Sequence, residues 1–184
     1  MNRVRLVSEA DASESVKSFY ANGDPGPIAA SLALVPDLME KILPFIGRAL
    51  GASEIALRTK EIVILRASSI QACRYCTDTH SVIALQAGLT PAQVSALRSD
   101  GDIADAFEAP ADRALIAWVE AVAGSAKVVP ESALTALREH FTEERVVELT
   151  VAVSATVMLN RYATAFALPV ADEHITQLKE HGWS

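Results

Sequence analysis

The chain has no stretch in which apolar and polar residues alternate as they do in a half-buried β-strand. Alanine, leucine and glutamate dominate instead, and helices tolerate all three well. Aromatic residues make up only 5% of the chain. The sequence therefore predicts an all-α protein, folded as a compact bundle of seven to nine helices.

Start and stop signals divide the chain into helices. Pro36 suits the first turn of a helix, and Gly88 is a natural C-terminal cap. Thr90–Gln93 reads as a capping box with proline at the first helical position. The run 22–27 is rich in glycine and proline and is predicted to be an irregular linker. The expected helices cover residues 36–50, 59–72, 73–88, 91 onward, 109–124, 130–140, 142–165 and 171–181.

Length and charge limit the kind of protein. The 184 residues suit one domain, and we expect residues 1–184 to form it. Because 51% of the residues are hydrophobic, a disordered chain is excluded. The formal charge of -7 argues against nucleic acid or an anionic membrane as a partner, since both bind basic surfaces.

No targeting or membrane-spanning segment is visible. Charged residues between Arg3 and Lys17 interrupt the region where the apolar part of a secretory signal would lie. The most apolar stretch, Val151–Leu159, is too short to cross a membrane. We therefore expect a cytoplasmic protein, in which cysteines are more often reduced, metal-bound or redox-active than structural.

Both cysteines lie in one short segment, Cys73–Cys76, and His80 follows four residues later. On a helix that advances about 100° per residue, Cys76 lies about 60° and His80 about 20° from Cys73, so the three share one face. Two thiols at this spacing can close a small disulfide ring, and a histidine one turn away can take a proton from a thiol. The pattern indicates a dithiol redox site.

Three other interpretations compete with a redox site. Two buried cysteines can simply be part of a helical core. Cys73, Cys76 and His80 can also be zinc ligands, although structural zinc usually has four. A thioredoxin-like domain would explain the cysteine pair, but it needs a βαβ pattern that this chain lacks.

Three segments resemble the alkyl hydroperoxidase D-like (AhpD-like) group of the carboxymuconolactone decarboxylase superfamily. They are Lys60–Arg66, Cys73–His80 and Ala87–Thr90. The shared pattern is a glutamate, eleven residues, CxxC, three residues and a histidine, and Glu61 supplies the glutamate. The resemblance covers residues 35–165, which leaves a helical extension at either end.

The resemblance implies an AhpD-like fold and an all-helical subunit that assembles into trimers or hexamers. The implied activity is reduction of hydroperoxides by the cysteine pair, without a metal or another cofactor. An external dithiol, on a lipoyl protein or a thioredoxin-like protein, would regenerate the pair. Two alternatives remain: a lactone-processing activity of the wider superfamily, whose decarboxylase branch lacks the cysteine pair, and a redox sensor or interaction module that does not turn over.

The resemblance also implies a role for each site residue. Glu61 would orient His80, His80 would deprotonate Cys76 directly or through a water, and Cys76 would attack the peroxide. Cys73 would then close the disulfide. The electrostatics of a helix start instead make Cys73 the more acidic thiol, so the roles of the two cysteines stay open. Tyr75 stands where the best-studied relative has a second histidine.

The relay places a condition on the fold. In one straight helix over residues 59–88, Glu61 would lie roughly 28 Å from His80 along the axis. The chain must therefore reverse near residues 69–73, where neither glycine nor proline marks a turn. Farther along, Asn160 and Arg161 can line the site or a subunit interface, or form an ion pair or a helix-terminal hydrogen bond. Asp78 is expected to face solvent.

Overall fold

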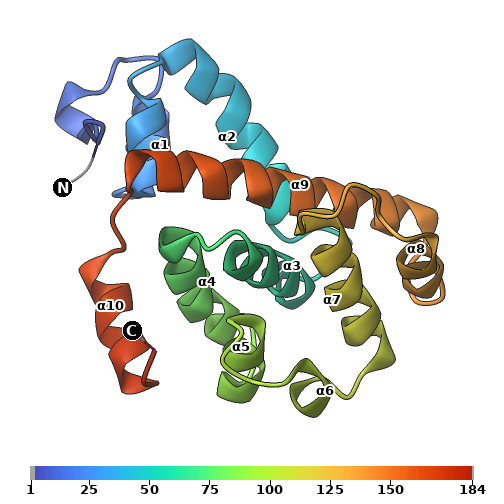
Figure 1. Ribbon diagram of the computed structural model, residues 1–184. Helices are drawn as coiled ribbons and strands as arrows, with labels where there is room; N and C mark the ends of the chain where they lie inside the picture. The colour runs from blue at the N-terminus through green and yellow to red at the C-terminus, as the bar shows by residue number, and fades with distance from the viewer. Residues whose placement is uncertain (1–2, 184) are drawn as a thin grey trace.

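The computed structural model describes residues 3–183, which contain ten α-helices, two short 3₁₀ turns and no β-strand (Figure 1). The helices are α1 (Gly26–Leu32), α2 (Pro36–Leu50), α3 (Leu57–Ile70), α4 (Arg74–Gln86), α5 (Pro91–Leu97), α6 (Ile103–Ala106), α7 (Pro110–Ala123), α8 (Glu131–Arg138), α9 (Glu143–Phe166) and α10 (Asp172–Glu180). The prediction of an all-α fold is confirmed. The number of helices exceeds the predicted range because α1 and α6 are short and were not expected.

Helix α1 begins inside the segment predicted to be an irregular linker. The carboxylate of Asp24 accepts a hydrogen bond of 2.8 Å from the backbone N–H of Gly26, the first residue of the helix. Pro27 follows within the first turn, where a missing backbone donor costs little. The prediction of a linker is therefore wrong for Gly26 and Pro27.

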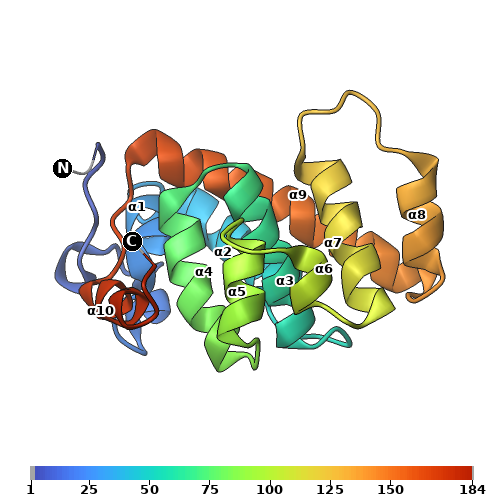
Figure 2. The ribbon, with the colours of Figure 1, turned by 60° about the horizontal axis from the view of Figure 1, so that its bottom comes forward.

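Helix α3 is the centre of the core. It packs against α4, α7 and α9, and its apolar side chains Ile62, Val63 and Leu65 are fully buried. Figure 1 shows α9 lying between α2 on one side and α3, α4 and α7 on the other. In Figure 2, α4 and α5 lie alongside α3. Residues on the inward faces of α3, α4 and α9 therefore meet inside the molecule.

A buried lysine ties three helices together. The Lys60 side chain of α3 is inaccessible to solvent, and its Nζ donates to the carbonyl of Ala49 over 2.7 Å and to Glu148 Oε1 over 2.8 Å. Glu148 of α9 also binds Arg48 of α2. The Arg48 guanidinium, followed by Lys60, holds the pKa of Glu148 well below its usual range. The ion cluster thus fixes α2 and α9 against α3.

The chain reverses between α3 and α4, as contact between Glu61 and His80 requires. The backbone N–H of Cys73 donates to the carbonyl of Ser68, and that of Ala72 donates to Ser69, both over 3.0 Å. These two bonds define a Schellman motif, whose turning residue adopts the left-handed conformation. That residue is Ala72, with φ of 49°. An alanine here does what glycine does at Gly88, at the end of α4.

Among residues 3–183, no helix combines the length and the apolar character that crossing a membrane requires.

Replacing Ala72 with glycine should stabilise the fold, because glycine adopts the left-handed conformation without a clash of its Cβ atom. The penalty for an L-residue is about 1–2 kcal/mol, so we expect Ala72→Gly to raise the free energy of unfolding in guanidinium by about 1 kcal/mol. Ala87, which ends α4 in the right-handed conformation, is the matched control. Ala87→Gly should bring no gain, and equal effects of the two variants would contradict the assignment of strain to Ala72.

Candidate active site

Glu61 of α3 and His80 of α4 are nineteen residues apart in sequence and in direct contact in the structure. The distance from His80 Nδ1 to Glu61 Oε2 is 2.9 Å, Glu61 is buried, and the His80 side chain is 23% exposed. An ionised carboxylate only accepts hydrogen bonds, so beside it Nδ1 carries the hydrogen. The Nε2 atom of His80 is then the nitrogen that can accept a proton.

The two cysteines lie at the start of α4, next to this pair of residues. Cys73 is the residue that caps α4, and Cys76 lies in its first turn. Both are buried and both are free thiols. Their position follows from the reversal at Ala72, which directs the N-terminus of α4 toward α9 (Figure 1).

The two sulfurs have different surroundings. Cys73 lines a cleft of about 560 Å³ between the start of α4, the end of α9 and α10, with apolar walls that include Ala163, Leu168 and Ile175. Cys76 lines a separate cavity of about 50 Å³ together with His80. Cys73, which is 1% exposed, therefore borders a space of organic size, while Cys76, which is 4% exposed, and His80 border a much smaller one.

Hydrogen bonding separates the acidities of the two thiols. The thiol of Cys76 donates toward the Cys73 sulfur, and this contact outweighs burial and lowers the pKa of Cys73 to about 6. The backbone N–H of Cys76 acts in the same direction. The pKa of Cys76 is raised, because its proton is held by Cys73 and because it is buried. Both shifts make Cys73 the more acidic of the two thiols, which is the direction that a position at a helix start also favours.

Two residues of α9 complete the site. The side chains of Thr164 and Asn160 both contribute to the low pKa of Cys73, and Asn160 also favours the thiolate of Cys76. Asn160 is buried and donates from Nδ2 to Ser68 Oγ over 2.9 Å. Thr164 was missed by sequence reasoning. The one available signal was two polar residues four apart on an apolar helix.

Asp78 does not face solvent as predicted. It is 5% exposed, and its carboxylate binds Arg98 over 3.2 Å and Arg74 over 3.4 Å. Arg98 in turn lies 5.5 Å from the ring centroid of Trp183. The prediction was wrong because it considered α4 alone, whereas α5 and the residues after α10 cover this face of α4. Asp78 therefore has a structural role, holding α4 against its neighbours.

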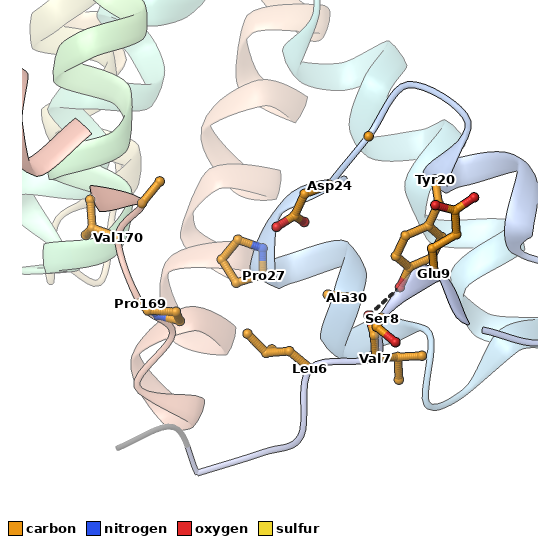
Figure 3. A pocket seen from close by; sticks show the side chains of 12 residues that line it. Leu6, Val7, Ser8, Glu9, Tyr20, Asp24, Pro27, Ala30, Pro169 and Val170 are labelled. Carbon is orange, nitrogen blue, oxygen red and sulfur yellow. Dashed lines mark hydrogen bonds between the residues drawn. The ribbon is translucent and has the colours of Figure 1, made fainter. Parts of the chain in front are cut away.

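A second cavity, of about 500 Å³, adjoins the Cys73 cleft. It lies between the N-terminal segment, α1 and the residues after α9, and it shares Pro169 and Val170 with the cleft (Figure 3). Tyr20 closes one side of it, with its hydroxyl donating to the carbonyl of Val7 over 2.9 Å. This cavity has no cysteine or histidine in its wall.

The alternative of a zinc site depends on whether the side chains that could bind the metal are grouped. Within the described residues, no three side chains of histidine, cysteine, aspartate or glutamate are grouped as metal ligands. Cys73 and Cys76 face each other, and His80 faces Glu61.

Known proteins share this fold. The model of the carboxymuconolactone decarboxylase family matches residues 36–121. The uncharacterized protein YdfG of Bacillus subtilis is 27% identical over 114 residues, which are 61% of this chain and 76% of that protein. The alkylhydroperoxidase AhpD core of an uncharacterized peroxidase-related protein from Ralstonia eutropha superimposes with a TM-score of 0.81 at 20% identity, covering 94% of each chain.

A protein with a different activity has the same fold. The debrominase Bmp8, solved in complex with 2,3,4-tribromopyrrole, superimposes with a TM-score of 0.79 at 20% identity, covering 97% of this chain and 96% of that one. The family match and the superpositions agree with the family resemblance and the all-helical fold expected from the sequence. The chain therefore has an AhpD-like fold and is similar, over residues 36–121, to the carboxymuconolactone decarboxylase family.

Proposed function

We propose that the chain is a dithiol peroxidase, which reduces hydroperoxides with Cys73 and Cys76 and is then re-reduced by an external dithiol. One observation carries the proposal. Two buried free cysteines of unlike pKa, one at the cap and one in the first turn of α4, lie beside the contact between Glu61 and His80. The thiolate is the form of cysteine that attacks peroxides, and a neighbouring thiol can resolve the product as a disulfide.

The volume of the adjoining space and the lower pKa favour Cys73 as the sulfur that meets the substrate. The Cys73 cleft of about 560 Å³ has room for an organic hydroperoxide. The cavity beside Cys76, of about 50 Å³, has room only for a few water-sized molecules. The resemblance implied attack by Cys76, and our proposal exchanges the two roles because the charge and the larger space both belong to Cys73.

The reaction then proceeds in two balanced steps. In the first, the Cys73 thiolate attacks the terminal peroxide oxygen, the O–O bond breaks, and the alkoxide takes a proton to leave as an alcohol. In the second, Cys76 gives up its proton and attacks the resulting sulfenic acid of Cys73, which forms the disulfide and releases hydroxide that is protonated to water. The alkoxide takes its proton from solvent, which replaces the proton that Cys73 lost when it became a thiolate. His80, oriented by Glu61, accepts the Cys76 proton and returns it to the hydroxide.

The pair must be re-reduced by two electrons from outside the protein. A dithiol, such as that of a lipoyl protein or of a thioredoxin-like protein, supplies them by thiol–disulfide exchange at the sulfur that lines the cleft. The fold is shared with a debrominase, so a brominated pyrrole is a suitable comparison substrate for this thiolate.

Steady-state turnover tests the function. With cumene hydroperoxide and excess dithiothreitol, we expect the wild type to consume many equivalents of peroxide and Cys73→Ser to consume none. Cys76→Ser should complete the first step and then form no internal disulfide. Removing a general base typically costs 10²–10⁴-fold in rate, so His80→Ala should lose at least about a hundredfold, and Glu61→Gln a smaller factor. A wild type that stops after one equivalent would identify a redox sensor.

The acidity of Cys73 has its own test. Its pKa of about 6 lies below the ordinary cysteine value of about 8.5, so the rate of alkylation by iodoacetamide should rise through pH 6 and level off near pH 7. Because the Cys76 thiol is the main cause of the low pKa, Cys76→Ala should move the midpoint toward the ordinary value. An unchanged midpoint in Cys76→Ala would show that the thiol of Cys76 does not stabilise the thiolate.

We propose further that the chain works as a homo-oligomer, with three or six copies as the resemblance implies. Large apolar side chains are exposed on neighbouring parts of α2 and α9, namely Phe45, Val147, Val151 and Met158, and they border one groove. Exposed apolar patches of this kind are typical of protein interfaces.

Light scattering after gel filtration tests the assembly. The wild type should have three or six times the chain mass of 19.6 kDa, and Val151→Glu should lower it, because a charge would be buried in the interface. Val128 is also exposed, in the loop after α7, so Val128→Glu is the matched control and should leave the mass unchanged. A monomeric wild type would reject this part of the proposal.

A further inference from the structure

Asn160 is the buried polar residue of the site with an unused hydrogen-bonding atom. Its Oδ1 is inaccessible to solvent and has no hydrogen-bond partner within residues 3–183. Its Nδ2 is held by Ser68 Oγ, which fixes the orientation of the amide. Folded proteins rarely leave such an acceptor unpaired, so the Oδ1 atom points to a bound group.

The space next to Asn160 suits one small polar molecule. Asn160, Cys76 and His80 line the same cavity of about 50 Å³, which exceeds the 10–15 Å³ that a single water needs. Within the described residues, no direct hydrogen bond joins Cys76 to His80. A buried water typically makes two to four hydrogen bonds, and this cavity offers it three partners: a thiol, an imidazole nitrogen and an amide oxygen.

We propose that Asn160 is a positioning residue, whose Oδ1 holds a water between Cys76 and His80 so that the water carries the Cys76 proton to His80. The inference rests on the proposed function, because it concerns the second step of that reaction, the closure of the disulfide.

Each hydrogen of this water has an acceptor, and its oxygen has a donor. One hydrogen of the water points to Asn160 Oδ1, and the other points to Nε2 of His80, whose Nδ1–H is directed at Glu61. Once Cys73 has reacted and is no longer a thiolate that accepts the Cys76 proton, the oxygen of the water accepts the Cys76 thiol. When Cys76 attacks Cys73, its proton passes to the water oxygen, and the water passes its own proton to Nε2. The buried Glu61 carboxylate then faces an imidazolium.

A disulfide reagent separates the two cysteines without requiring peroxidase activity. With 4,4′-dithiodipyridine, attack by Cys73 releases a first equivalent of thiopyridone, and closure by Cys76 releases a second. We expect Asn160→Leu to slow the second phase at least tenfold and to shift its pH midpoint upward. The first phase should change less than threefold, because the Cys76 thiol, and not Asn160, is the main support of the Cys73 thiolate.

Thr156→Val is the matched control. Thr156 borders the same cavity on the same helix, but its hydroxyl donates to the carbonyl of Ala152 over 2.8 Å and is therefore not free to bind a water. Both phases should keep the wild-type rate in this variant.

Circular dichroism and the first phase report whether Asn160→Leu is folded. If Asn160→Leu is not folded, Ser68→Ala replaces it in the test. Without the Ser68 hydroxyl, the Asn160 amide can rotate, so we expect the second phase to be three- to tenfold slower. The inference would be overturned if folded Asn160→Leu kept the wild-type rate and pH midpoint of the second phase. The same result in Ser68→Ala, where that variant replaces it, would also overturn the inference. A wild type with two normal phases and no peroxide consumption would reject the proposed function and leave the role of Asn160 standing.

Discussion

Glu61 and His80 meet because the chain turns back on itself within four residues, between the end of α3 and the start of α4. The relative placement of α3, α4 and the cysteine pair follows from that turn. It sets the two helices side by side, places Cys73 at the cap of α4, and brings the backbone N–H of Cys76 toward the Cys73 sulfur. Two backbone hydrogen bonds and one left-handed alanine hold it.

A turn of this kind is useful only if the helices on either side of it are held in place. Helix α3 is fixed by burial on all sides and by Lys60, whose ammonium group is satisfied by a backbone carbonyl and by Glu148. Helix α4 is fixed on its other face by the ion pair of Asp78 and Arg98. The reactive groups therefore sit on rigid elements, and the contact between Glu61 and His80 needs no mobile loop.

Much of the fold and part of the site could be predicted from the sequence. Helix periodicity and capping signals were strong, and the spacing of Glu61, Cys73, Cys76 and His80 identified the residues that the structure brings together. The turn at Ala72 could not be predicted, because glycine is the residue normally expected in the left-handed conformation. Asn160 lies eighty-four residues after Cys76, and no local pattern indicates which helix packs opposite the cysteines.

The low pKa of Cys73 has a thermodynamic consequence beyond its reactivity. Whatever stabilises the thiolate stabilises the reduced form of the pair, and so makes its disulfide a stronger oxidant. The same property makes Cys73 a good leaving group when an outside thiolate attacks the sulfur of Cys76, which borders only the small cavity. An attack at Cys73, which borders the larger cleft, must instead expel the more basic Cys76 thiolate. In the proposed regeneration, the larger space adjoins Cys73 and the better leaving group is released by attack at Cys76. Return of a proton from His80 to Cys76 would favour attack at Cys73.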